Sequence, residues 1–186
     1  MKKVFLVSVS ILAVWLLAGC GAKKETHVYE IEGFTFTFDA PKGFFTASTE
    51  RKDFYYPVTN TSGAIVYIGE TFSMNVGVNG CNFTTELWDS FVNNVYAKRE
   101  LFQKLDFEGV YGTYRIFESA AIRYRMLGTL EEYCINIDFV PNEYKNMPSE
   151  AYRDKEKEAV YLQKCTELSN DKVVQDIMKS LKIKKN

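Results

Sequence analysis

The stretch Leu130–Val140, with the sequence LEEYCINIDFV, decides the fold because apolar and polar side chains alternate along it. One side carries Tyr133, Ile135, Ile137 and Phe139, and the other carries Cys134, Asn136 and Asp138. Alternation with a period of two is typical of a β-strand with one buried face. The stretch therefore predicts a sheet with an apolar face on a core and a polar face directed outward.

The preceding segment, Ala121–Leu127, alternates in the same way. Its apolar side chains are separated by two arginines, Arg123 and Arg125. Gly128 and Thr129 predict a tight turn between the two strands, because glycine adopts turn conformations at low steric cost. We expect the two strands to pair as neighbours in an antiparallel meander.

Such pairing gathers polar side chains on one face of the sheet. The candidate binding surface there consists of Arg123, Arg125, Asn136 and Asp138. Arg115 is a further candidate for the same face. One interpretation is a cross-strand ladder of ion pairs that faces water or a helix. The other is an anion-binding patch, because guanidinium groups suit carboxylates and phosphates.

The remaining pattern predicts more strands and three helices. Strands are expected over Tyr29–Phe38, over Ala64–Val78 as one long or two short strands, and around Tyr114–Phe117. Helices are expected after Thr84 or Thr85 as N-cap, over Ser149–Cys165, and after Ser169 or Asn170 as N-cap. This mixture of elements predicts a single α+β domain over residues 29–186.

The N-terminus has the pattern of a bacterial lipoprotein signal peptide. Lys2 and Lys3 precede an apolar run, Val4–Leu17, which is too short for a comfortable bilayer span of roughly 18–20 residues. The run closes on the lipobox Leu17-Ala18-Gly19-Cys20. Ordinary secretion would need a small-x-small site and no cysteine, and an uncleaved anchor is the remaining alternative.

This pattern predicts three segments. They are a signal peptide over residues 1–19, a lipidated Cys20 with a short tether over residues 20–28, and the domain that follows. Two acyl chains on Cys20 would hold the protein stably on a membrane, where one chain is marginal. We expect the protein at the outer face of the cytoplasmic membrane, or at the outer membrane if the cell has one.

Charge argues against a nucleic-acid partner. The whole chain has a formal net charge of −1, and loss of Lys2 and Lys3 with the leader makes it more negative. A nucleic-acid-binding domain normally shows a basic excess. The expected partners are therefore the membrane, through Cys20, and an envelope protein or an unidentified small ligand.

Three cysteines follow Cys20: Cys81, Cys134 and Cys165. An odd number outside the cytoplasm implies one disulfide with one free thiol, or three free thiols. We predict a Cys134–Cys165 disulfide, since the segment between them can fold back on its strand. Their spacing matches no zinc motif, so no metal is expected.

Aromatic residues are abundant, with 12 Tyr and 14 Phe. Tyr55 and Tyr56 belong to an aromatic segment, Phe44–Thr59, that lacks clear periodicity. Aromatic side chains in irregular segments serve either as parts of the core or as interface anchors. Both interpretations stay open, and these two tyrosines join the candidate binding surface.

The order of motifs resembles that of PsbP-like domains. The similarity lies in the opening GFTFTFDAPKGF, the Gly-containing FEGVYGTYRIF after a helix, the strand YCINIDFV and a closing helix before SLKI. The resemblance implies an antiparallel β-sheet packed between α-helices. It also implies a binding or assembly role, because members of this group share no catalytic residues to transfer.

The sequence has few of the side chains that catalytic sites commonly use. His27 is the single histidine and lies in the predicted tether, so Ser-His-Asp and Cys-His arrangements are not expected. No phosphate-binding glycine loop or calcium loop is present, and no cofactor is expected. We therefore expect a non-enzymatic binding or assembly module. The alternative is a small-ligand receptor with a pocket between sheet and helix.

Overall fold

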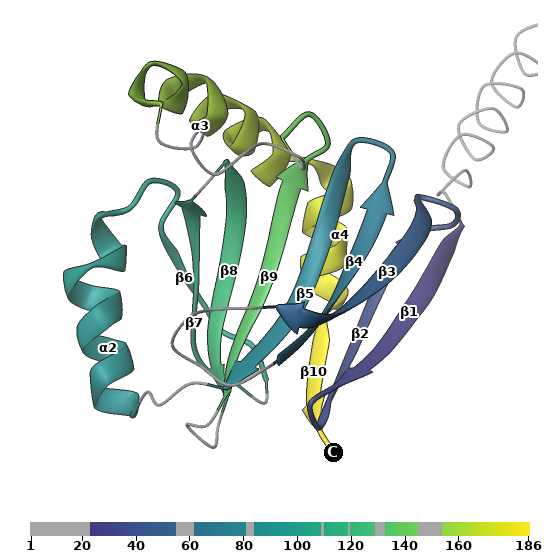
Figure 1. Cartoon of the computed structure of the whole chain (residues 1–186), viewed down its shortest axis with the longest axis horizontal. Helices are drawn as coiled ribbons and strands as arrows, with labels where there is room; N and C mark the ends of the chain where they lie inside the picture. Colours follow the sequence, from purple (N-terminus) through teal and green to yellow (C-terminus); the bar gives the residue numbers. More distant parts are fainter. Residues whose placement is uncertain are drawn as a thin grey trace, which may run out of the picture.

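The computed structural model describes residues 23–54, 62–80, 84–108, 110–118, 120–128, 133–144 and 154–186. These form an α+β domain with two antiparallel sheets, as Figure 1 shows. The strands are β1 (Lys24–Ile31), β2 (Phe34–Pro41), β3 (Phe45–Phe54), β4 (Ser62–Gly69), β5 (Phe72–Gly80), β6 (Gln103–Leu105), β7 (Val110–Glu118), β8 (Ala121–Gly128), β9 (Tyr133–Pro141) and β10 (Lys182–Lys185).

The three-stranded sheet has the order β1-β2-β10, and the seven-stranded sheet has the order β3-β4-β5-β9-β8-β7-β6. The helices are α2 (Thr85–Asn94), α3 (Lys155–Ser169), α4 (Lys172–Ser180) and the short η1 (Tyr96–Lys98).

The central meander agrees with the sequence. Strand β8 pairs antiparallel with β9, and β9 pairs antiparallel with β5. The segment Ala64–Val78 forms two strands, β4 and β5, which pair with each other. Part of the aromatic stretch after Phe44 is also regular, since β3 pairs with β4.

The first expected strand, Tyr29–Phe38, is in fact a hairpin. Strands β1 and β2 pair with Ile31 opposite Phe34, which leaves a two-residue turn. Both turn residues, Glu32 and Gly33, have positive φ, at 48° and 77°. Positive φ at both central positions defines the tight turn whose twist matches paired strands. The glutamate at the first position hides this turn from sequence patterns that look for Asn-Gly or Asp-Gly.

This hairpin also corrects the predicted tether boundary. Strand β1 begins at Lys24, so residues 24–28 belong to the domain and not to a tether. His27 lies opposite Phe38 in the hairpin. The strand was missed because only every second residue of β1 faces inward, and those inward residues include Glu25 and His27.

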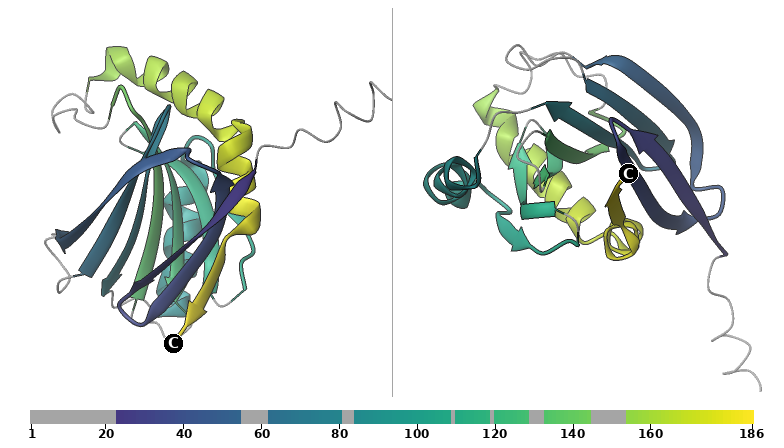
Figure 2. Two further views of the ribbon diagram at one scale, coloured as in Figure 1. Left: turned by 90° about the vertical axis from the view of Figure 1, so that its right-hand side faces the viewer. Right: turned by 90° about the horizontal axis from the view of Figure 1, so that it is seen from below.

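The core lies between the two sheets. Figure 2 shows both sheets curving around a common interior, with α4 beside the three-stranded sheet. Strand β2 directs Phe34, Phe36 and Phe38 into this interior, where all three are at most 2% exposed. The seven-stranded sheet contributes Phe72, Met74, Val76, Ile122, Met126, Ile135, Ile137 and Phe139. Each buried large apolar side chain contributes about 1.5–3 kcal/mol.

Helices α3 and α4 complete the core. Helix α4 packs on β2, and its buried residues are Val174, Ile177 and Met178. Helix α3 packs on β8 and β9. The predicted N-cap of the last helix was one or two residues early, because the Asp171 carboxylate accepts hydrogen bonds from the backbone of Val173 and Val174. The expected Thr84 cap of α2 is confirmed by its hydrogen bond from the backbone of Leu87.

Two buried groups make the stability of this core sensitive to alkaline pH. Burial raises the pKa of the Cys165 thiol from 9.0 to about 12. Burial, together with the neighbouring Tyr29, raises the pKa of Tyr67 from 10.0 to about 12. The unfolded chain therefore loses these protons at lower pH than the folded chain does. The free energy of unfolding should fall as pH rises from about 9 toward 12.

We expect a Tyr67→Phe/Cys165→Ala double variant to lose stability less steeply over that alkaline range. Each group contributes a slope of at most about 1.4 kcal/mol per pH unit. Urea unfolding at several pH values from 8 to about 10.5 measures the slope. Parallel curves for the two proteins would contradict the assignment.

Candidate functional site

The face of the seven-stranded sheet that points away from the core carries a row of polar side chains. Register places Asn75 and Arg123 on either side of Asp138, and Gly77 and Arg125 on either side of Asn136. Residues directly opposite one another in neighbouring strands point to the same face. Arg123, Arg125, Asn136 and Asp138 therefore share a face, as the sequence predicted. The side chain of Arg125 lies outside the described part of the structure.

Arg123 is engaged by two carboxylates. Its Nε and Nη2 atoms donate to Oδ1 and Oδ2 of Asp138 at 2.8 and 2.9 Å, and its Nη1 donates to Oε2 of Glu118 at 2.7 Å. The side chains of Arg123 and Asp138 are only 14% and 12% exposed. This geometry matches the predicted ion-pair ladder. It weakens the anion-patch hypothesis at Arg123, because two carboxylates already occupy the fork of the guanidinium.

A shallow hollow lies beside this ion pair. Its volume of about 20 Å³ has room for roughly one water molecule. The lining comes from four strands, β4, β5, β8 and β9, and consists of Ala64, Asn75, Gly77, Asn79, Arg123, Asn136 and Asp138. Gly77 lies beside Ala64, and the absence of large side chains at these two positions leaves space for the hollow. We call Asn75, Asn79, Arg123, Asn136 and Asp138 the outer-face cluster.

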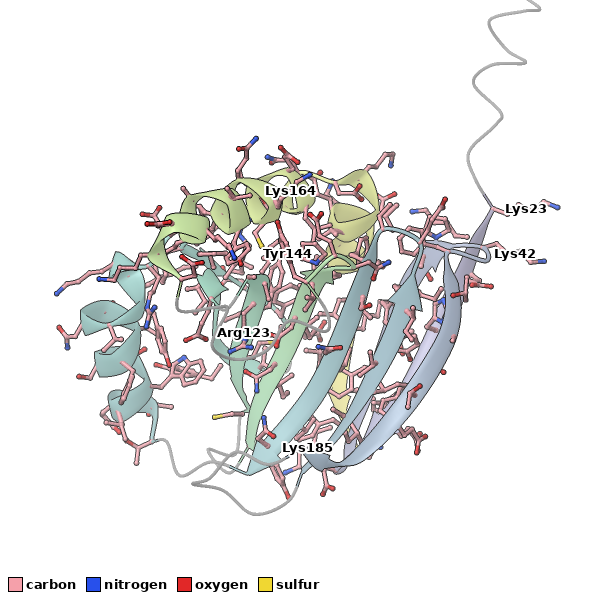
Figure 3. The ribbon with its side chains drawn as sticks, turned by 45° about the horizontal axis from the view of Figure 1, so that its top comes forward. Lys23, Lys42, Arg123, Tyr144, Lys164 and Lys185 are labelled. Atoms are coloured by element: carbon pink, nitrogen blue, oxygen red, sulfur yellow. The ribbon has the colours of Figure 1, made fainter. Side chains whose placement is uncertain are left out.

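The outer-face cluster is suited to hydrogen bonding. Its three amide groups each offer donors and an acceptor, and its ion pair adds charged atoms of both signs. Figure 3 places Arg123 on the sheet among neighbouring side chains. Helix α2 covers an adjoining part of the same face, where its Trp88 and Val92 pack with Ile116 of β7. The hollow itself is lined by strands and not by a helix, unlike the pocket expected between sheet and helix.

Arg115 is on the opposite face, so its assignment to the polar surface was wrong. Register places Arg115 opposite Tyr124, whereas Ile116 lies opposite Arg123. Arg115 and Arg123 therefore point to different faces of the sheet. Its Nε atom donates to the backbone oxygen of Leu101 at 3.4 Å. Burial raises the pKa of Tyr124, and the nearby Arg115 opposes part of that rise. The sequence did not reveal the phase of β7, which pairs with β8 across an irregular register.

The predicted Cys134–Cys165 disulfide is also wrong. Cys134 is disulfide-bonded, but Cys165 is a free thiol. The two residues lie on opposite sides of the seven-stranded sheet: Cys165 on α3 is buried in the core, and Cys134 on β9 packs with Trp88 and Ile116 under α2. The sheet separates them. The other two cysteines, Cys20 and Cys81, lie outside the described residues.

Two further candidates cannot be placed. Tyr55 and Tyr56, predicted as part of the binding surface, lie outside the described residues, as does the lipidation site Cys20. The neighbouring aromatic residue Phe45 is described and belongs to the edge of the core.

His27 lies in an aromatic cluster that the sequence did not predict. Its ring stacks on Phe38 with centroids 5.0 Å apart and meets Phe45 and Tyr67 edge-on, each at 5.5 Å. Its Nε2 atom is 3.4 Å from Oε1 of Glu25 but makes no hydrogen bond. The contacts show that His27 helps to join the two sheets. In the sequence, the inward position of His27 was indicated only by its place in the alternating series Glu25, His27, Tyr29 and Ile31.

Among the described residues, no group of three or more His, Cys, Asp or Glu side chains is arranged to hold a metal ion. None of the helices in the described ranges combines the length and hydropathy needed to cross a bilayer.

Comparison with protein-family models, with curated proteins and with solved structures finds no significant match for this chain.

Removal of Arg123 tests the role of the ion pair. We expect Arg123→Met to lower the free energy of unfolding by on the order of 3 kcal/mol, because it removes the guanidinium that two poorly hydrated carboxylates share. The double variant Arg123→Met/Asp138→Leu should recover part of that loss, since it also removes one of those charges. Urea unfolding measures both, with the exposed Lys184→Met as control. Equal stabilities for Arg123→Met and Lys184→Met would refute the structural role.

Proposed function

We propose that this chain is a membrane-anchored extracytoplasmic lipoprotein. The observation that carries the proposal is the lipobox Leu17-Ala18-Gly19-Cys20 behind a lysine-headed apolar run. The disulfide at Cys134 supports it, because structural disulfides persist mainly outside the cytoplasm. The anchor would hold the protein at the outer face of the cytoplasmic membrane, or at an outer membrane where the cell has one.

The proposal also selects a partner for Cys134. An acylated Cys20 has no thiol left for a disulfide, and Cys165 is free. Cys81 then remains as the partner.

For the domain itself, we propose a non-enzymatic binding or assembly module of PsbP-like type. The antiparallel sheets with helices α3 and α4 on one side support this architecture. The outer-face cluster supports a binding role, because it presents amide donors and acceptors around a shallow hollow. A polar surface that spans four strands suits a partner that lies across them.

A small-ligand receptor is the second candidate. The same hollow supports it, because buried or half-buried amide groups can orient a polar ligand. Its volume of about 20 Å³ favours contact with part of a larger partner over enclosure of a free ligand. A ligand-dependent rise in the melting temperature of the purified protein would favour the receptor.

The anchor is tested by changing the acceptor residue. We expect Cys20→Ala to leave the precursor unprocessed or to release the protein from membranes, because no other residue accepts diacylglycerol at this position. Fractionation and the intact mass of the protein measure both effects. Normally processed, membrane-bound Cys20→Ala protein would rule out lipidation at Cys20.

The binding role is tested by photo-crosslinking in native membranes. A photoreactive residue at Asn75 should give a discrete adduct, and the same group at Glu32, on the β1–β2 turn, should not. Gly77→Val provides the matched variant. A Cβ at Gly77 meets only ordinary contacts, the nearest at 3.6 Å, so this change should fill the hollow without unfolding the sheet.

We expect Gly77→Val to abolish the adduct from Asn75. An adduct that persists in Gly77→Val, or that forms equally well from Glu32, would exclude the outer-face cluster as the contact surface. An Asn75 probe without any adduct, together with a ligand-dependent melting shift, would favour the receptor.

A further inference from the structure

Lysines from three distant segments gather where the chain enters strand β1. Lys24 starts the strand and Lys23 directly precedes it, Lys42 lies on the turn between β2 and β3, and Lys172 begins α4. The backbone N–H of Lys42 donates to the backbone oxygen of Lys23 at 2.7 Å. The Nζ atoms of Lys24 and Lys172 both contact Oδ2 of Asp176, at 3.5 and 2.8 Å. These four residues are the lysine cluster.

The lysine cluster faces solvent. The side chain of Lys172 is 86% exposed and that of Lys24 is 52% exposed, and Lys23 and Lys42 are also exposed. Figure 3 shows Lys23 and Lys42 together at one end of the domain, with Lys185 at the opposite end. Three carboxylates lie beside them: Asp176, the helix-capping Asp171 and Glu25, which accepts a hydrogen bond from the backbone of Gly43. Four lysines against three carboxylates leave the cluster with a small excess of positive charge.

The position of this cluster in the chain indicates its partner. Lys23 follows Cys20 by three positions along the chain, and a fully extended chain covers at most about 3.6 Å per residue. Lys23 would then lie within about 11 Å of a lipidated Cys20. This distance is comparable to the Debye length of about 8 Å at physiological ionic strength. The electrostatic potential of a charged bilayer surface would therefore act on the Lys23 side chain.

We propose that the lysine cluster docks on the anionic headgroups of the bilayer that holds Cys20. The inference rests on the lipid anchor proposed above and adds an orientation to it. Basic residues near an anionic leaflet are attracted to it, and attraction falls off within a Debye length. Docking would set the start of β1, the β2–β3 turn and the first turn of α4 against the membrane.

The other end of the three-stranded sheet would then point away from the membrane. Register places Lys24 opposite Pro41 at the docked end and Lys185 opposite Phe34 at the far end. Eight residues of β-strand span about 27 Å, which is several Debye lengths. Lys184 and Lys185 are therefore internal controls with the same chemistry as the cluster.

The test uses the full-length mature lipoprotein purified from membranes and reconstituted into vesicles. One set of vesicles is pure phosphatidylcholine, and the other contains one third phosphatidylglycerol. Flotation first establishes that the protein stays with both. Brief labelling with an amine-reactive reagent, followed by peptide mass spectrometry, then gives the modification rate of each lysine.

We expect Lys23, Lys42 and Lys172 to react several-fold more slowly on anionic than on neutral vesicles, and Lys184 and Lys185 to react equally on both. Added 0.5 M KCl should remove the difference. Lys42→Glu should reduce the protection of Lys23, and the matched Lys184→Glu, which changes the net charge equally, should not.

Equal modification rates on both kinds of vesicle, for a protein that floats with them, would overturn docking and leave the anchor intact. Protection of Lys23 that is unchanged in Lys42→Glu would overturn the cluster as the docking surface. A protein that floats with neither vesicle would overturn the anchor and, with it, the docking.

Discussion

The fold depends on covering the apolar face of the seven-stranded sheet. Strands β5, β8 and β9 turn a continuous apolar layer inward, and no single helix is wide enough to bury it. Strand β2 supplies the main cover with its three inward phenylalanines, and α4 packs on β2 in turn. The edge-on contact of Phe38 with Tyr67, at 5.2 Å, joins the two sheets directly. Burial of this size dominates the other contributions to stability.

The seven-stranded sheet also separates the side chains of its two faces into different environments. Neighbouring residues on one strand end in different environments, because side chains alternate across the pleat. Cys134 can form a disulfide on the outer side while the Cys165 thiol is enclosed on the inner side. Arg123 and Arg115 are separated in the same way, although they lie on neighbouring strands. The outer face consequently carries the ion pair of Arg123 and Asp138, and the inner face carries the main apolar core.

Much of this could be predicted from the sequence where alternation is clean. Residues 133–140 and 121–127 predicted two paired strands and the shared face of Arg123 and Asp138, because period-two patterning needs no knowledge of distant contacts. The β1–β2 turn at Glu32 and the strand β10 after α4 escaped prediction, since tertiary pairing and not local propensity forms them. The disulfide was mispredicted because connectivity depends on which side of a sheet each cysteine lies.

Strand β10 ends the chain, yet it pairs with β2 near the beginning: Lys182 lies opposite Thr37, and the backbone N–H of Asn186 donates to the backbone oxygen of Gly33. This closure joins residues about as far apart in sequence as the domain allows, and such contacts are slow to form because a long loop must close first. Until β10 forms, β2 has an open edge beside the β1–β2 hairpin. The three-stranded sheet is therefore complete only after Lys182–Lys185 are present, and a variant that lacks these residues would leave the inner phenylalanine strand with that edge open.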